Sequence, residues 1–150
     1  MKKFHSPLQK VRKVLDQQLS YRTAQLLRSR HVISRIDDEI ESIRTDMRNA
    51  GQLLNTHTHL HAGVLESTNS NNQALKTRLE HKQDQKQQEL HRNRTLTEEV
   101  RQATAMCDGL DEILRRRYEA HRKRNMHAEQ IAFDESFASR NHTGSGEDGD

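Results

Sequence analysis

The sequence has very few of the residues that build a conventional globular core. Its 150 positions include one proline, one cysteine, six glycines, two tyrosines, three phenylalanines and no tryptophan. Sandwiches, barrels and doubly wound sheets need many β-branched and aromatic residues, together with frequent turn-forming glycine and proline. Hydrophobic and charged residues each make up 31% of the chain. The composition therefore excludes these sheet folds and leaves a long helix that buries one narrow stripe, or a disordered chain.

No segment has the pattern of a secretory signal or a membrane span. Polar residues follow the basic start Met1-Lys2-Lys3, and no apolar run approaches the roughly 18–20 residues that a span needs. The single Cys107 cannot form an internal disulfide and suits a reducing compartment. We expect a cytoplasmic protein, located at the cytoplasmic face of the inner membrane only through a partner.

A first long helix is expected over residues of about 6–66. Ser6, Pro7 and Gln9 form a capping-box pattern with proline at the first helical position. From Leu19 onward, apolar residues recur in alternating steps of three and four, which is the pattern of a coiled-coil seam. Val11 fits that stepping only if a stutter of four residues is inserted before Leu19. The predicted seam of this helix contains Ile33, Ile36, Ile40, Ile43, Met47 and Leu54.

A turn is expected over residues of about 67–72, where six polar, turn-prone residues run together. A second helix of about 73–138 follows, and Ser70 and Gln73 have the spacing of a second capping box. Four consecutive seam positions between Lys82 and Asn93 are polar, so this stretch should pack thinly or face something other than the first helix. The predicted seam of the second helix contains Leu96, Val100, Cys107, Leu110 and Leu114.

The predicted fold is all-α: a long two-helix antiparallel coiled-coil hairpin over residues 1–140. An acidic, glycine-rich tail at 141–150 is expected to be disordered. Periodicity alone does not identify the partner of a seam, so a parallel dimer and a disordered monomer remain alternatives. The low net charge of +3 weighs against disorder, and the central position of the turn favours the hairpin.

No pattern of an active site, a cofactor site or a metal site emerges. His57 and His61 would share a helix face at a spacing that can hold a metal, with His59 between them, but no third ligand is evident. Cys107 falls on the seam, where a small thiol fills space. The predicted protein is therefore not an enzyme and carries no cofactor.

Basic residues are densest at Arg115, Arg116 and Arg117 and again at 122–124. Such a cluster can neutralise phosphates, so a nucleic-acid-binding coiled coil is one alternative function. Leucine-zipper proteins, however, place their basic region before the heptads, whereas here it follows them. Aromatic residues that could stack on bases are also missing from this stretch. A solvated face or a surface for an acidic protein is the preferred interpretation.

Two terminal segments carry a resemblance to a known family. The opening Lys3–Leu15 resembles the start of FliJ-family flagellar export proteins, with an aromatic residue, a Pro-Leu pair and a Lys-Val step that lead into a long helix. The segment Glu129–Arg140 resembles the family's closing motif, in which a Gln precedes an apolar-Asp-Glu triplet and a basic residue. The matching positions here are Gln130, Asp134 and Glu135.

The resemblance implies a component of the flagellar type III export apparatus. Family members form an antiparallel coiled coil, insert into the ring of the export ATPase hexamer, contact the cytoplasmic domain of the export-gate membrane protein and bind export chaperones. By analogy, Leu8–Leu19 and Leu114–Phe137 would enter the ring. The polar stretch Gln83–Gln88 is a hypothetical gate contact. The equivalent stalk of a virulence injectisome is the nearest alternative.

Overall fold

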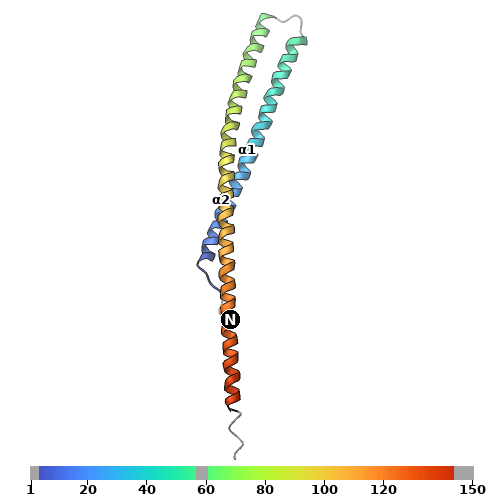
Figure 1. Cartoon of the computed structure of the whole chain (residues 1–150). Helices are drawn as coiled ribbons and strands as arrows, with labels where there is room; N and C mark the ends of the chain where they lie inside the picture. Colours follow the sequence, from blue (N-terminus) through green and yellow to red (C-terminus); the bar gives the residue numbers. More distant parts are fainter. Residues whose placement is uncertain (1–3, 57–60, 144–150) are drawn as a thin grey trace, which may run out of the picture. The chain divides into compact units, whose positions relative to one another are not determined.

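The computed structural model describes residues 4–56 and 61–143, and within these ranges it contains two helices and no strand. Helix α1 spans Leu8–Thr56 and helix α2 spans Ala62–Thr143 (Figure 1). The two helices pack against each other, which confirms the all-α hairpin. The chain divides into a central unit, Leu19–Gln102, and a terminal unit, which comprises Met1–Gln18 and Ala103–Asp150.

In the central unit, α1 and α2 lie side by side and run antiparallel (Figure 1). In successive contacts between the helices, the residue number on α1 rises while the residue number on α2 falls, as expected for antiparallel helices. The polar contacts that join the two helices are Ser29–Asn93, Asp37–Lys86 and Glu39–Lys82. The polar seam between Lys82 and Asn93 therefore faces the first helix, contrary to one of the two expectations from the sequence.

The core of the central unit is one narrow stripe on each helix. Its most buried large side chain is Ile43, and the adjacent Ile36 and Ile40 are also buried. Every position of the alternating three–four stepping on α1 in this unit is buried or partly buried, namely Leu19, Arg22, Leu26, Ser29, Ile33, Ile36, Ile40, Ile43, Met47, Ala50 and Leu54. On α2, Leu96 is buried and Val100 is partly buried. One narrow apolar stripe is sufficient to pack each helix, because each helix has one neighbouring helix in this unit.

The terminal unit pairs the start of α1 with a later part of α2. Its buried stripe on α2 contains Ala103 and Cys107, followed by the partly buried Leu110 and Leu114. The Arg12 guanidinium donates to both carboxylate oxygens of Asp111 at 2.7 and 3.0 Å. This pair lowers the pKa of the Asp111 carboxyl, chiefly through the hydrogen bond from Arg12.

The N-terminal segment reaches α2 through an aromatic contact. The Phe4 ring lies edge-on to Tyr118 with centroids 5.6 Å apart, and 5.5 Å from the ring of His121. Such contacts between rings add to the stabilisation that their apolar burial provides. Phe4 thus anchors the chain next to the start of α1 within the terminal unit.

The position of the turn differs from the sequence prediction. Residues 67–72 are helical, because α2 begins at Ala62, where the carbonyl of His61 accepts from the amides of Val64 and Leu65. Serine and asparagine cost only about 0.5 kcal/mol each in a helix, too little to break it. The Thr68 hydroxyl donates to the Val64 carbonyl at 2.8 Å, so its polar group is satisfied inside the helix. Thr56 ends α1, ten residues earlier than expected.

The C-terminal boundary also differs from the expectation. Helix α2 continues to Thr143, beyond the predicted end at 138, so residues 141–143 of the expected tail are helical. The remainder of that tail, 144–150, lies outside the described residues. The capping box predicted from Ser70 lies inside α2 and starts no helix.

Two local predictions at the start of α1 were wrong. The Ser6 hydroxyl is buried and has no hydrogen-bond partner, whereas the Ser6 carbonyl accepts from the Gln9 amide at 3.0 Å. No stutter is needed either, because Arg12 is partly buried and Val11 is exposed. The partly buried positions Leu8, Arg12, Leu15 and Leu19 keep the regular stepping, with an arginine at one seam position. Its ion pair with Asp111 explains why a charged residue fits there.

Replacing Gly51 with alanine is expected to stabilise the protein by about 1 kcal/mol. Gly51 lies in the interior of α1, and a Cβ atom added there meets nothing within 4 Å. Alanine therefore gains helix propensity without a steric cost. Thermal denaturation followed by circular dichroism should show a higher midpoint, and a lower midpoint would contradict the helical assignment at Gly51.

Candidate functional site

The last part of α2 has no partner helix in the described chain. Every residue from 126 to 140 is exposed, although this stretch carries large apolar side chains. Phe133 and Phe137 are 65% and 58% exposed, and Met126 and Ile131 are also exposed. Isolated exposed apolar residues are common, but several on one short helical stretch mark a surface for another molecule.

Three of these side chains form one face, which we call the C-terminal apolar face: Met126, Phe133 and Phe137. Their spacings of seven and four place them on the same side of a helix. The rings of Phe133 and Phe137 are 6.0 Å apart. At 100° per residue, Met126 lies about 140° around the helix from His121, which contacts Phe4. The C-terminal apolar face therefore does not continue the side of α2 that contacts Phe4.

The residues that carry the closing-motif resemblance lie beside this face. Gln130, Asp134 and Glu135 are all exposed on α2, and Asp134 directly follows Phe133. No side-chain hydrogen bond or ion pair joins any of the three to another residue in the described parts of the chain. Their polar groups are therefore available to a partner that covers the C-terminal apolar face.

The arginine run at 115–117 is only partly available. Arg115 forms ion pairs with Glu112 at 2.9 Å and with Glu119 at 2.7 Å, and Arg116 contacts the same Glu112 at 2.8 Å. Hydrogen bonds from Arg115 and then Arg116 lower the pKa of Glu112 to about 2. Arg117 has no acidic partner within the described residues. Two of the three arginines are thus neutralised locally, which weakens this run as a phosphate-binding surface.

Acid should destabilise the helix around these pairs. The pKa of Glu112 in the folded protein lies below its usual 4.5, so the ion pairs stabilise the fold above pH 4.5 and are lost as the pH falls towards 2. Glu98, which accepts from Arg101 and Gln102, has its pKa lowered to about 2 in the same way. We expect the thermal midpoint to fall between pH 4.5 and 2, and to fall less in Glu112→Gln. Identical pH profiles for both proteins would contradict the assignment.

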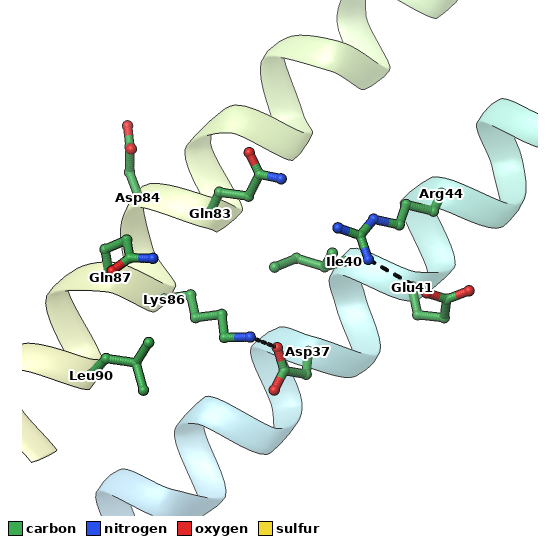
Figure 2. A pocket seen from close by; sticks show the side chains of 9 residues that line it. All are labelled: Asp37, Ile40, Glu41, Arg44, Gln83, Asp84, Lys86, Gln87 and Leu90. Atoms are coloured by element: carbon green, nitrogen blue, oxygen red, sulfur yellow. Dashed lines mark ion pairs between the residues drawn. The ribbon is translucent and has the colours of Figure 1, made fainter.

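The central unit presents a polar groove between its helices. Figure 2 shows Lys86 reaching from α2 to Asp37 on α1, at 2.5 Å, while Ile40 points towards α2. The groove has a volume of about 720 Å³ and is lined by Asp37, Ile40, Glu41, Arg44, Gln83, Asp84, Lys86, Gln87 and Leu90. It includes part of the stretch Gln83–Gln88 that the sequence singles out as a gate contact.

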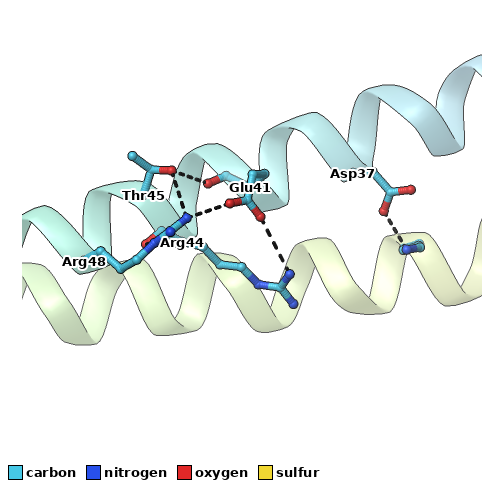
Figure 3. A network of polar contacts seen from close by, with 6 residues as sticks. Asp37, Glu41, Arg44, Thr45 and Arg48 are labelled. Carbon is cyan, nitrogen blue, oxygen red and sulfur yellow. Dashed lines mark hydrogen bonds and ion pairs between the residues drawn. The ribbon is translucent and has the colours of Figure 1, made fainter.

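Charged side chains on α1 continue from this groove as a network. Figure 3 shows Glu41 next to two arginines, Arg48 at 2.6 Å and Arg44 at 3.9 Å. On the other helix, Lys82 pairs with Glu39 and lowers the pKa of the Glu39 carboxyl. The groove therefore offers both signs of charge over a narrow apolar floor, which is a surface for polar protein contacts.

The remaining candidates from the sequence are Cys107 and the histidines at 57, 59 and 61. Cys107 is a buried free thiol on the seam. His57 and His59 lie outside the described residues, and no group of three potential metal ligands occurs in the parts that are described. Neither described helix has an apolar stretch long enough to cross a membrane.

Sequence reasoning missed the direction of the C-terminal apolar face and the contacts between helices. The spacing of Met126, Phe133 and Phe137 was a usable signal for the face. The Arg12–Asp111 pair could not be found without knowing which residues lie opposite each other. Comparison of the chain with protein-family models, with curated proteins and with solved structures finds no match to any of them.

Proposed function

We propose that this protein is a stalk of the flagellar type III export apparatus that links the export ATPase ring to the membrane export gate. The observation that carries the proposal is the exposure of the end of α2, where all residues from 126 to 140 are exposed. This stretch coincides with the segment that resembles the closing motif of the FliJ family. A single helix about 10–12 Å across is narrow enough to enter the opening of a protein ring.

The ring contact is proposed at the C-terminal apolar face. Burying Phe133 and Phe137 against apolar residues of the ring supplies affinity, because both rings are exposed in the free chain. Gln130, Asp134 and Glu135 beside them supply directional polar contacts. This arrangement has the form of a protein-binding hot spot, with aromatic anchors and a polar rim.

The gate contact is proposed at the polar groove of the central unit. The groove is lined by acidic, basic and amide side chains, which suit a partner with a mixed polar surface. Contacts of this kind give specificity more than raw affinity. Export chaperones would be further partners, and the membrane would be reached only through the gate protein. The protein itself would catalyse no reaction and hold no cofactor.

The decisive experiment measures binding to the purified flagellar export ATPase and to the cytoplasmic domain of the gate protein. We expect a stable complex with the ATPase and faster ATP hydrolysis by its hexamer. Absence of binding to both proteins at micromolar concentrations would overturn the proposal.

The nearest alternative is the stalk of a virulence injectisome, which would bind its own ATPase through the same kind of exposed helix end. Parallel binding assays with a flagellar and an injectisome ATPase separate the two, since tighter binding to the injectisome enzyme would favour the alternative. The flagellar or injectisome nature of the neighbouring genes answers the same question. A nucleic-acid-binding coiled coil, the second alternative, would instead show affinity for DNA or RNA that falls steeply with salt.

A further inference from the structure

A second exposed stripe runs along α2 in the terminal unit, separate from the C-terminal apolar face. Met106, Gly109 and Ile113 each directly precede a residue of the seam, so they lie about 100° around the helix from it. The partly buried Ala120 continues the stripe at one end, because Met106, Ile113 and Ala120 recur every seven residues. Met106 is 59% exposed and Ile113 is 46% exposed. We call this set the second stripe.

The glycine in the second stripe has no role in the packing of the chain. Gly109 lies in the interior of α2, and a Cβ atom added there meets nothing within 4 Å. A glycine at such a position weakens a helix compared with alanine. What it provides is a site where a second backbone can approach α2 closely. The open space over Gly109 lies between the exposed side chains of Met106 and Ile113.

Cations surround the Ala120 end of the second stripe. Arg116, Arg117, Lys123 and Arg124 lie next to Ala120 by helical spacing, and all four are exposed. Arg117, Lys123 and Arg124 have no acidic partner in the part of the chain that the structure describes. Arg116 pairs with Glu112, whereas Arg115, on a different side of the helix, is held by Glu112 and Glu119. The charge of this flank is therefore left largely uncompensated.

We propose that the second stripe and its cationic flank bind an acidic amphipathic helix of a partner protein. Apolar residues every seven positions match the repeat of a docked helix, and the small Gly109 with open space over it lets that helix approach closely. The uncompensated cations select acidic side chains at the edges of that helix. This interface uses neither Phe133 nor Phe137, so variants at those two residues test the ring contact separately from it.

Two other occupants fit less well. A second copy of the same chain would bring the cationic flanks together unless it docked through a different, acidic face. A nucleic acid would neutralise the cations, but its phosphate backbone offers no apolar surface for Met106 and Ile113. The stretch from Met106 to Arg124 has one aromatic residue, Tyr118, which packs against Phe4 and cannot stack on bases there.

The test uses the full chain and two synthetic 21-residue amphipathic peptides, measured by fluorescence anisotropy in 150 mM salt. One peptide has leucine at the first and fourth heptad positions and glutamate at the flanking positions. The other has lysine in place of each glutamate. We expect the acidic peptide to bind saturably and at least tenfold more tightly than the basic one. Lys123→Glu/Arg124→Glu should weaken its binding at least tenfold, whereas the matched control Arg92→Glu/Arg94→Glu should change it less than twofold.

A second variant separates binding from folding. Gly109→Gln places a side chain in open space and improves helix propensity, so it should raise the thermal midpoint. The same side chain should block the docked helix and weaken binding of the acidic peptide at least tenfold. Equal binding of both peptides, no binding of either, or unchanged affinity in Gly109→Gln would overturn the proposal. It would also be overturned if duplex DNA or RNA bound more tightly than the acidic peptide. A dimer in sedimentation that Ile113→Gln dissociates would assign the stripe to a second copy instead.

Discussion

Replacing Ile43 with aspartate is expected to unfold the central unit or to destabilise it by at least about 3 kcal/mol. Ile43 is 2% exposed, the most buried large side chain of the described chain. The variant loses the apolar burial of isoleucine and places a carboxylate at a position that is almost completely buried in the helix pair. At roughly 4–8 °C per kcal/mol for a unit of this size, the thermal midpoint should fall by more than about 12 °C. Circular dichroism measures both helicity and midpoint.

The matched control is Leu27→Asp on the same helix. Leu27 is 51% exposed, so the same carboxylate remains solvated and should change stability by less than about 1 kcal/mol. If the two variants behave alike, the seam does not carry the stability of the central unit. Selective loss of helicity in Ile43→Asp is the outcome that the packing requires.

Phe133→Ser/Phe137→Ser is expected to weaken binding to the export ATPase at least a hundredfold. Burying a phenylalanine contributes about 1.5–3 kcal/mol, so loss of two rings removes at least about 3 kcal/mol from the complex. Each 1.4 kcal/mol corresponds to roughly a factor of ten in the dissociation constant. Both rings are exposed in the free chain, so its thermal midpoint should hardly change. Titration calorimetry with the purified ATPase measures the affinity.

The control for this variant is Tyr21→Ser/Leu53→Ser, which removes two other exposed apolar side chains, both from the central unit. It should leave affinity for the ATPase within a factor of two. Equal loss of affinity in both variants would show that binding follows general hydrophobicity and not the C-terminal apolar face. Unchanged affinity in Phe133→Ser/Phe137→Ser would place the ring contact elsewhere.

The helix pair was predictable from sequence because the spacing of apolar residues identifies a coiled-coil seam. The alternation of three and four from Leu19 to Leu54 names the side of α1 that is buried, without knowledge of the partner. It also found Cys107 and Leu110 on α2, the first buried and the second partly buried. Periodicity gives the direction of a side chain on its own helix. This direction depends only on nearby residues of the same helix and not on the partner helix.

Other features were not predictable because small local preferences, such as helix propensity and hydrophobicity, compete there with hydrogen bonds and packing. The run at 67–72 looked like a turn, yet each serine or asparagine there costs a helix too little to end it. Arg12 occupies a seam position because Asp111, 99 residues away, provides its partner. Val11 looked the better seam residue on hydrophobicity alone. In both places, a contact or a helical hydrogen bond outweighed the local preference.

The distance along the chain between paired residues has a consequence for the order of folding. Ser29 and Asn93 are 64 residues apart, whereas Arg12 and Asp111 are 99 apart. Closing a longer loop costs more chain entropy, although the cost rises only slowly with length. We therefore expect the helix pair to zip from the middle of the sequence outwards and to fray first at Phe4 and Arg12. Amide hydrogen exchange should then be fastest in the terminal unit. A partner that docks there would also hold its two segments together and slow this exchange.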